Sequence, residues 1–351
     1  AASASDAEKK YIETLRGRGL LPFAVTPHFA SLAGPDRNDP VRRQFFPDPA
    51  EALPDPFALD DPLGEGRHRA APRLVHQYRD RALLLAGASC AGYCRCCFRR
   101  VWLSAAPALI HCGGDSGGDN AGPALAYLAD HPEIRETLVS GGDPLTMDND
   151  RLEALFRALR KARPGIALRV CTRAPVTWPD RLDDAAIALF RRFRPLRLSV
   201  QINHSRELAP SCRERLAACA ASGIPVLVQT VLLRGVNDDP AALADLVSRC
   251  GALGLTPYYL FQLDLAPGTA HFRLPLKRGF ALYAELRALL GGTAAPVYAV
   301  DLPGGGGKIR LDENAVAGER VIPGKAGRGL EDRRVYLLRD GAGTLWEYPA
   351  E

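Results

Sequence analysis

The sequence predicts an α/β fold in which a parallel sheet curls into a full or partial (β/α)6 barrel. Its 351 residues, 47% hydrophobic and 24% charged, suffice for one large domain of this type. From residue 81 onward, short apolar runs alternate with amphipathic helical patterns, which is typical of a parallel sheet with crossover helices. Polar residues cluster directly after these runs, as they do at the carboxyl ends of barrel strands.

Residues 1–75 are expected to wrap around a core that is formed elsewhere. A short helix is predicted at 6–18, and prolines then interrupt any long periodic pattern. The barrel is predicted to occupy residues 76–275. Its six strands are expected at 82–87, 136–141, 166–171, 196–202, 225–233 and 257–262.

The predicted helices between these strands carry apolar residues at the 3.6-residue period, so that each buries one stripe against the sheet. Asp150 is the expected N-cap of one helix, and Asp239 followed by Pro240 the expected start of another. Residues 276–351 are expected to form a C-terminal extension. It should contain a helix at 277–290, a strand at 296–301 and a less regular tail.

Charge and cysteine content narrow the class of protein. The net charge of +5 is modest and arginines are spread along the chain, which gives little support to a nucleic-acid or membrane-surface role. No apolar run approaches the ~20 residues that span a bilayer, and the first residues lack an apolar signal core. We therefore expect a cytoplasmic protein. Nine cysteines, four of them within eight residues, suggest a metal centre rather than a disulfide scaffold.

Cys90, Cys94 and Cys97 form a CxxxCxxC pattern after the first predicted strand. Three thiolates can hold three irons of a [4Fe-4S] cluster and leave the fourth iron open to a substrate. A zinc site ordinarily needs a fourth ligand, and the sequence has no second knuckle to supply one. Cys96 is expected to be a bystander. The remaining cysteines are expected to be small buried hydrophobes, namely Cys112, Cys171, Cys212, Cys219 and Cys250.

PGGGGK, which ends at Lys308, is a second chemical feature. It is not a Walker A loop, because Leu302 and Ile309 stand where that pattern needs Gly and Ser or Thr. A lysine beside four glycines can instead form a Schiff base with a flat cofactor that approaches the backbone closely. Asp264 and Asp301 would meet at the same barrel mouth, where two carboxylates favour a cationic group. Taken singly, each is equally compatible with a solvated loop position or a helix cap.

The stretch CAGYCRCCFRR (90–100) matches the CxxYCRxCxRR loop of the lysine 2,3-aminomutase family, within the radical S-adenosylmethionine superfamily. Further matches occur in order: NDPVRRQ (38–44), DPL (61–63), YRDR (78–81), SGGDPL (140–145), TVLLRGVND (230–238), PYY (257–259), AHF (270–272) and PGGGGK (303–308). The chain thus resembles this family from about residue 20 to about residue 310. The resemblance implies a partial radical-SAM barrel and an isomerase that converts L-lysine to β-lysine by moving its α-amino group to the β-carbon.

The resemblance also implies three cofactors: a [4Fe-4S] cluster on Cys90, Cys94 and Cys97, S-adenosylmethionine, and pyridoxal 5′-phosphate on Lys308. Arg81 would reach the cofactor phosphate, for which a guanidinium fork is suited. Asp264 and Asp301 would bind the side-chain ammonium of lysine, and Arg99 its carboxylate. An electron donor such as flavodoxin or ferredoxin is implied as a partner.

S-adenosylmethionine would contact Gln229 and the SGGD stretch, that is Ser140, Gly141, Gly142 and Asp143. The glycines are equally compatible with a tight turn alone. Gln201 stands where many relatives have a histidine near S-adenosylmethionine, and an amide there can donate and accept hydrogen bonds but carries no charge. The zinc-binding cysteines of some relatives are missing, with Asp239 in place of one, so the resemblance leaves a homo-oligomer undecided.

Three alternatives stay open at this point. The same machinery could act on arginine, whose cationic end also suits the two aspartates. A branch that makes β-lysine for modification of elongation factor P shares the FRR ending of the cysteine motif, although it usually lacks PGGGGK. A chain of another class, a non-enzymatic iron–sulfur or zinc-binding module, would need none of the substrate residues.

Overall fold

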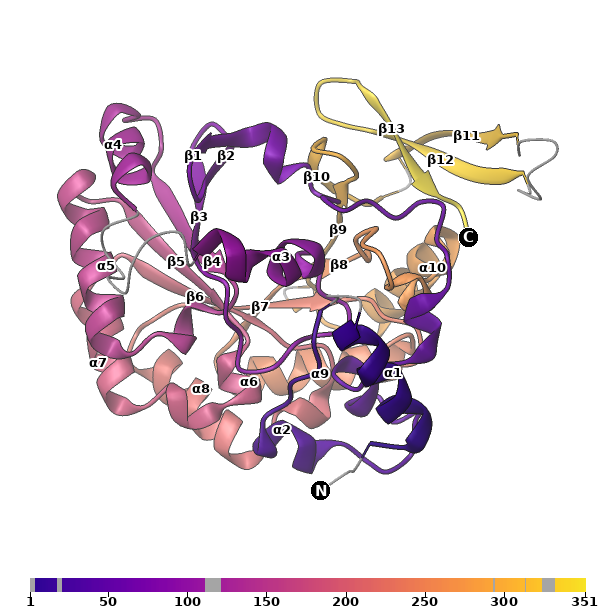
Figure 1. The fold of residues 1–351 in the computed structure, drawn as a ribbon, viewed down its shortest axis with the longest axis horizontal. Coiled ribbons are helices and arrows are strands. Elements are labelled where there is room, and N and C mark those ends of the chain that lie inside the picture. Colours follow the sequence, from indigo (N-terminus) through magenta and orange to yellow (C-terminus); the bar gives the residue numbers. More distant parts are fainter. Residues whose placement is uncertain (1–3, 18–20, 111–120, 293, 313, 324–331) are drawn as a thin grey trace.

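The computed structural model describes residues 4–17, 21–110, 121–292, 294–312, 314–323 and 332–351. Cys112 lies outside the described residues. Within them, ten strands form one sheet in the order β1 to β10 (Figure 1). Seven neighbouring strands are parallel: β3 (Arg81–Gly87), β4 (Glu136–Gly141), β5 (Ala167–Thr172), β6 (Leu196–Gln201), β7 (Val226–Val231), β8 (Thr256–Phe261) and β9 (Val297–Leu302).

Antiparallel strands flank this parallel sheet at both edges, namely β1 (Arg69–Ala71) and β2 (Leu74–Tyr78) at one and β10 (Gly307–Arg310) at the other. In the described chain β1 and β10 end the strand order and are not paired with each other, so the sheet is an open, partial barrel. The six predicted strands are all present. β9, which the sequence assigns to the C-terminal extension, extends the same sheet because it pairs with β8.

Helices cover the outer face of the sheet (Figure 1). They are α4 (Gly122–Asp130), α5 (Asn149–Ala162), α7 (Asp184–Arg192), α8 (Pro210–Ala221) and α9 (Pro240–Ala252). The N-cap of α5 is Asp148, which accepts a hydrogen bond from the Arg151 amide at 2.8 Å, and not Asp150, which lies in the first turn. Both aspartates suit a helix start, and only the backbone conformation at Asp148 selects it. Asp239 caps α9 as predicted.

The C-terminal residues are more regular than the sequence predicts. In the described part of the tail, β11 (Val316–Ile322), β12 (Arg333–Arg339) and β13 (Leu345–Pro349) form a three-stranded antiparallel sheet, drawn in yellow in Figure 1. Val335, Tyr336 and Leu338 of β12 are buried. Tyr336 and Leu338 pack with Tyr348 in a core shared with α10 (Leu276–Leu289) and β9.

The N-terminal residues lie across the barrel as a wrap of short elements. They comprise α1 (Asp6–Gly17), α2 (Pro27–Leu32), and the 3-10 helices η1 (Arg42–Gln44), η2 (Pro49–Ala52) and η3 (Glu65–His68). The remaining short elements are α3 (Arg100–Ile110), α6 (Ala174–Thr177), η4 (Pro144–Thr146), η5 (Pro179–Arg181), η6 (Ser205–Glu207) and η7 (Ala270–Phe272). Among the helices of the described chain, none combines the length and apolar character that crossing a bilayer requires.

Candidate active site

A cavity of about 330 Å³, here called the central cavity, lies at the carboxyl ends of the parallel strands. Its size is that of a small-molecule site. Every site residue predicted from the sequence lines it: Arg81, Cys90, Cys94, Cys97, Arg99, Ser140, Gly141, Gly142, Asp143, Gln201, Gln229, Asp264, Asp301 and Lys308. The fold therefore brings together side chains that are separated by more than 200 positions in the sequence.

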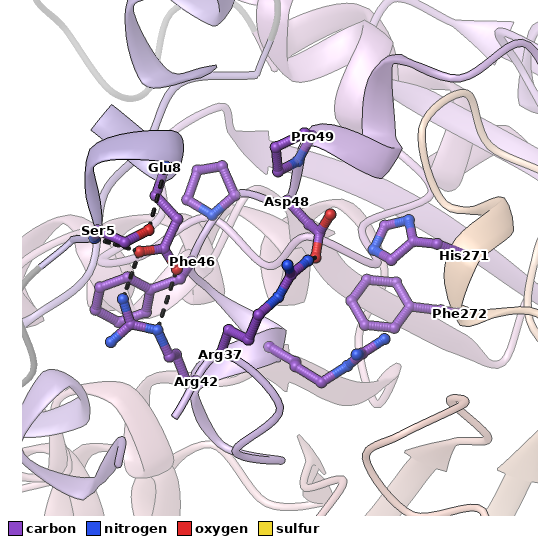
Figure 2. A pocket seen from close by; sticks show the side chains of 11 residues that line it. Ser5, Glu8, Arg37, Arg42, Phe46, Asp48, Pro49, His271 and Phe272 are labelled. Carbon is purple, nitrogen blue, oxygen red and sulfur yellow. Dashed lines mark hydrogen bonds and ion pairs between the residues drawn. The ribbon is translucent and has the colours of Figure 1, made fainter. Parts of the chain in front are cut away.

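A smaller cavity of about 80 Å³ lies between the N-terminal wrap and η7 (Figure 2). Two of its arginines already have carboxylate partners, since Arg42 pairs with Glu8 at 2.5 Å and Arg37 with Asp48 at 3.4 Å. None of the predicted site residues lines it. We therefore place the candidate active site in the central cavity.

The motif cysteines lie in the loop between β3 and α3, residues 88–99, here called the cysteine loop. All three thiols are free and line the central cavity. Burial and the neighbouring Cys94 raise the pKa of Cys97 to about 11. Within the described residues no three His, Cys, Asp or Glu side chains converge closely enough to hold a metal ion. The donor set nevertheless suits a cluster by chemistry, because three thiols face one space and lose their protons when metal binds.

Buried ion pairs fix the cysteine loop to the N-terminal wrap. Arg95 and Arg100, both inside the cysteine motif, donate to the same carboxylate oxygen of Glu51 at 2.5 Å each. Burial by itself would raise the pKa of Glu51, but the two guanidinium groups lower it below its usual range. The Tyr93 amide also donates to the Ala24 carbonyl at 2.9 Å. Two arginines of the motif therefore support the loop and do not face the substrate space.

The glycines after β4 allow a second loop to contact the cysteine loop, backbone against backbone. Gly141 has φ +116°, and a Cβ on Gly142 would lie 2.3 Å from the Ser89 carbonyl oxygen. Asp143 accepts four hydrogen bonds, from the amides of residues 145, 173 and 174 and from the Thr172 hydroxyl. Burial raises the pKa of Asp143. These residues join the ends of β4 and β5 to the cysteine loop.

Lys308 and the two aspartates also line the central cavity. Lys308 on β10 is the cross-strand partner of Asp301 on β9, and its Nζ lies 2.6 Å from the Asp301 carboxylate. The same Nζ is 3.9 Å from the centre of the Phe261 ring. Burial and the charge of Asp301 raise the pKa of Asp264 to about 8, although Lys308 and Arg99 oppose the shift. Lys308 and Arg99 therefore do not keep Asp264 ionised at neutral pH, and an added cation would favour its ionised form.

The glycine loop, residues 303–307, packs directly on the segment that begins at Pro62. Its Gly304 amide donates to the Pro62 carbonyl at 2.8 Å. A Cβ on Gly64 would lie 2.6 Å from the Gly304 carbonyl carbon. A Cβ on Gly306 would lie 2.5 Å from the Trp346 ring. The Lys308 amide donates to the Tyr78 hydroxyl at 2.8 Å, so the lysine backbone is fixed from both sides of the loop.

Arg99 and Glu65 form an ion pair at the cavity wall. Arg99 donates to Glu65 through Nε at 3.0 Å and Nη2 at 2.6 Å, and to the Ser140 hydroxyl through Nη1 at 3.2 Å. Glu65 is a site residue that sequence reasoning missed, and its position two residues after the DPL match was the available signal. Arg81 lies over the Tyr78 ring at 3.9 Å, with Asp80 beside it.

Gln201 ends β6 and is paired in register with Gln229 on the neighbouring strand β7. Cys96 is buried in a small apolar cluster with Leu233, Val236, Leu263 and Phe272, which accounts for its place in the motif as packing. Of the other described cysteines, Cys212, Cys219 and Cys250 are buried as expected. Cys171 differs from the expectation, because it is only partly buried and lines the central cavity near the end of β5.

The chain is similar to several known proteins over most of its length. It is 41% identical to a Treponema pallidum protein provisionally named L-lysine 2,3-aminomutase, over 88% of this chain and 83% of that one. It is 35% identical to an L-lysine 2,3-aminomutase of Escherichia coli K12, over 88% of each chain. A Bacillus subtilis L-lysine 2,3-aminomutase is 34% identical, over 94% of this chain and 66% of that enzyme.

Among solved structures, Streptococcus suis SuiB bound to S-adenosylmethionine aligns with a TM-score of 0.48 at 10% identity, over 67% of this chain and 52% of that one. No protein-family model matches the chain.

Proposed function

Since the chain belongs to the lysine 2,3-aminomutase family, we propose that it is an isomerase that moves the α-amino group of L-lysine to the β-carbon. The product is β-lysine. The observation that carries this proposal is that the cysteine triad, the glycine-loop lysine and the paired aspartates line one cavity. A non-enzymatic iron–sulfur or zinc module would not require Lys308 and two aspartates facing the same space.

The residues present suit three cofactors. Cys90, Cys94 and Cys97 would hold a [4Fe-4S] cluster, Lys308 would bind pyridoxal phosphate, and Arg81 its phosphate. The end of β4 at Gly141, the residues that follow it and Gln229 on β7 would hold S-adenosylmethionine. When bound, these groups supply hydrogen-atom abstraction at carbon and an imine link that lets the nitrogen migrate. A one-electron donor of the flavodoxin or ferredoxin class is part of the proposal, as is a reducing cytoplasmic setting for the free thiols.

The chain itself binds and orients the amino acid. Asp264 and Asp301 would accept the ε-ammonium, which would favour the ionised form of Asp264, whose pKa burial and the charge of Asp301 raise to about 8. Arg99 would bind the carboxylate, held in direction by Glu65 and Ser140. Phe261 and Tyr259 line the space beside Lys308 and exclude water from it. The two ends of lysine would thus be bound by different side chains of the central cavity.

The test is anaerobic incubation with a reductant, pyridoxal phosphate and S-adenosylmethionine, with lysine and arginine offered in separate reactions. We expect β-lysine from lysine; a β-amino acid from arginine alone would reassign the substrate, and none from either would refute the proposal. Lys308→Ala is the matched control. It should lose product and the pyridoxal phosphate absorbance while it keeps about four irons per chain.

A further inference from the structure

Arg173 is a buried arginine that contacts a cysteine of the motif. It follows β5 directly and is 7% exposed. Its Nη1 donates to the Cys94 sulfur at 2.9 Å. Its Nη2 donates to the Glu207 carboxylate at 2.9 Å and to the Gln44 side-chain oxygen. One guanidinium group therefore joins the cysteine loop to the N-terminal wrap and to the loop after β6.

The partners of Arg173 are themselves fixed. Glu207 and Gln44 have no exposed surface, and the Gln44 amide donates to Glu207 at 2.9 Å. Glu207 also accepts from the amides of Asn203 at 3.0 Å and His204 at 2.8 Å. Both terminal nitrogens of Arg173 have partners, although its buried Nε has none among the described residues. Fixed partners at both terminal nitrogens hold the guanidinium group in one orientation. The Nη1 of Arg173 is therefore held in its direction toward Cys94.

We infer that Arg173 is a positioning residue that donates a charge-assisted hydrogen bond to the Cys94 thiolate and so raises the reduction potential of the cluster. This inference rests on the proposed function. Hydrogen bonds to cluster sulfurs and nearby positive charge are two of the factors that set such potentials. The cluster with its thiolates gains one negative charge on reduction. The charge-assisted hydrogen bond therefore stabilises the reduced cluster more than the oxidised cluster.

The opposing contribution is the negative charge of Glu207. It lies on the Nη2 side of Arg173, away from the sulfur, and its carboxylate oxygens also accept hydrogen bonds from Gln44 and from two backbone amides. Its charge is thus partly compensated by donors other than Arg173. The hydrogen bond from Nη1, in direct contact with the ligand sulfur, dominates at the cluster.

The inference also accounts for residues of the family-matching stretches that have no proposed contact with the substrate or the cofactors. Gln44 ends the NDPVRRQ stretch, and Asn237 belongs to TVLLRGVND. Asn237 donates to the backbone carbonyls of Asn203 and Val231, and the Asn203 side chain donates to Gln44 at 3.0 Å. Gln44, Asn203 and Asn237 surround Arg173 and do not line the central cavity. Their positions serve the arginine and not the substrate.

The experiment is a redox titration followed by electron paramagnetic resonance, on anaerobically reconstituted protein without S-adenosylmethionine. Arg173→Met should lower the ratio of reduced to oxidised cluster about tenfold at a fixed potential, a shift of about 59 mV for a one-electron couple. Arg173→Lys keeps the positive charge but loses the planar guanidinium group that donates from two nitrogens. It should lower the ratio of reduced to oxidised cluster by less. Arg169→Met removes another cavity-lining arginine, one paired with Glu136, and should leave the ratio unchanged.

Iron content and thermal unfolding are measured on each variant. An unchanged midpoint potential of the cluster in iron-replete Arg173→Met overturns the inference. This holds even if the variant binds S-adenosylmethionine more weakly. If that variant does not retain iron, Arg173→Lys decides by the same criterion. Loss of iron from both variants, with folding intact, would show a role only in cluster assembly and also overturn it. Wild-type protein that takes up no cluster would instead contradict the proposed function.

Discussion

Asp264 is expected to release a proton when a cationic ligand binds. Burial and Asp301 raise its pKa to about 8 from an ordinary value of 3.8. At pH 7 about nine tenths of this carboxyl is therefore protonated, and at pH 9 about one tenth. A bound ammonium favours the ionised form. Binding should release about 0.9 proton at pH 7 and about 0.1 at pH 9, and affinity should be about tenfold weaker at pH 7 than its limiting value.

The ligand for this test is 6-aminohexanoate, which is lysine without its α-amino group and does not titrate between pH 7 and 9. Isothermal titration calorimetry in two buffers of different ionisation enthalpy counts the protons released. Asp264→Asn should release none, and its affinity should not change over this range. Wild-type binding at pH 7 without proton release would refute the reasoning, because Asp264 would then already be ionised beside Asp301.

The same raised pKa affects stability without ligand. Between pH 3.8 and about 8 the folded chain keeps a proton on Asp264 that the unfolded chain has released, so this residue's contribution to stability falls as pH rises through that window. Asp264→Asn should therefore raise the free energy of unfolding relative to wild type more at pH 8 than at pH 4. Denaturant titrations at the two pH values measure this, and an equal effect at both would contradict it.

Two further substitutions test the supports of the site. Glu65→Ala removes the bidentate partner of Arg99, and we expect kcat/KM for lysine to fall about tenfold because Arg99 is no longer oriented. Glu65→Gln should keep most of the wild-type kcat/KM. A wild-type kcat/KM in Glu65→Ala would argue against the positioning role. Gly64→Ala forces a side chain at φ +63° and within 2.6 Å of Gly304, and should cost more than about 2 kcal/mol by denaturant titration. Gly251→Ala, on an open face of α9, is its control and should be neutral or stabilising.

The barrel strands could be predicted because each is a short apolar run bounded by turn residues, and their side chains are buried on the faces of a covered sheet. That Cys90, Asp143 and Asp264 line one cavity could be predicted because each follows one of those runs. The roles assigned to these residues stay a prediction. The start of α5 could not, since Asp148 and Asp150 differ only in backbone conformation. Strands β11 to β13 escaped prediction because their apolar runs are short: the run of β12 is only Val335 to Leu338 between arginines, and Gly318, Glu319 and Arg320 interrupt β11.

The supports of the site were beyond sequence reasoning for a different reason. Glu51 lies 44 positions before Arg95, and Glu207 lies 34 positions after Arg173. A carboxylate in a loop gives no sign of its partner until the fold brings the two together. Glu65 had a signal in its neighbourhood, the DPL match, but no spacing rule connects it to Arg99.

The N-terminal wrap has a geometric consequence for the reaction. It contacts the cysteine loop through a hydrogen bond at Ala24 and an ion pair at Glu51. Further along, it contacts the glycine loop through a hydrogen bond at Pro62. A single length of backbone thus spans from the thiols to Lys308, and it fixes the separation between the place where a radical would arise and the place where the amino acid would be held. Insertions or deletions between residues 51 and 62 would therefore change the distance between the cysteine loop and the glycine loop, and with it the distance over which a hydrogen atom would be transferred.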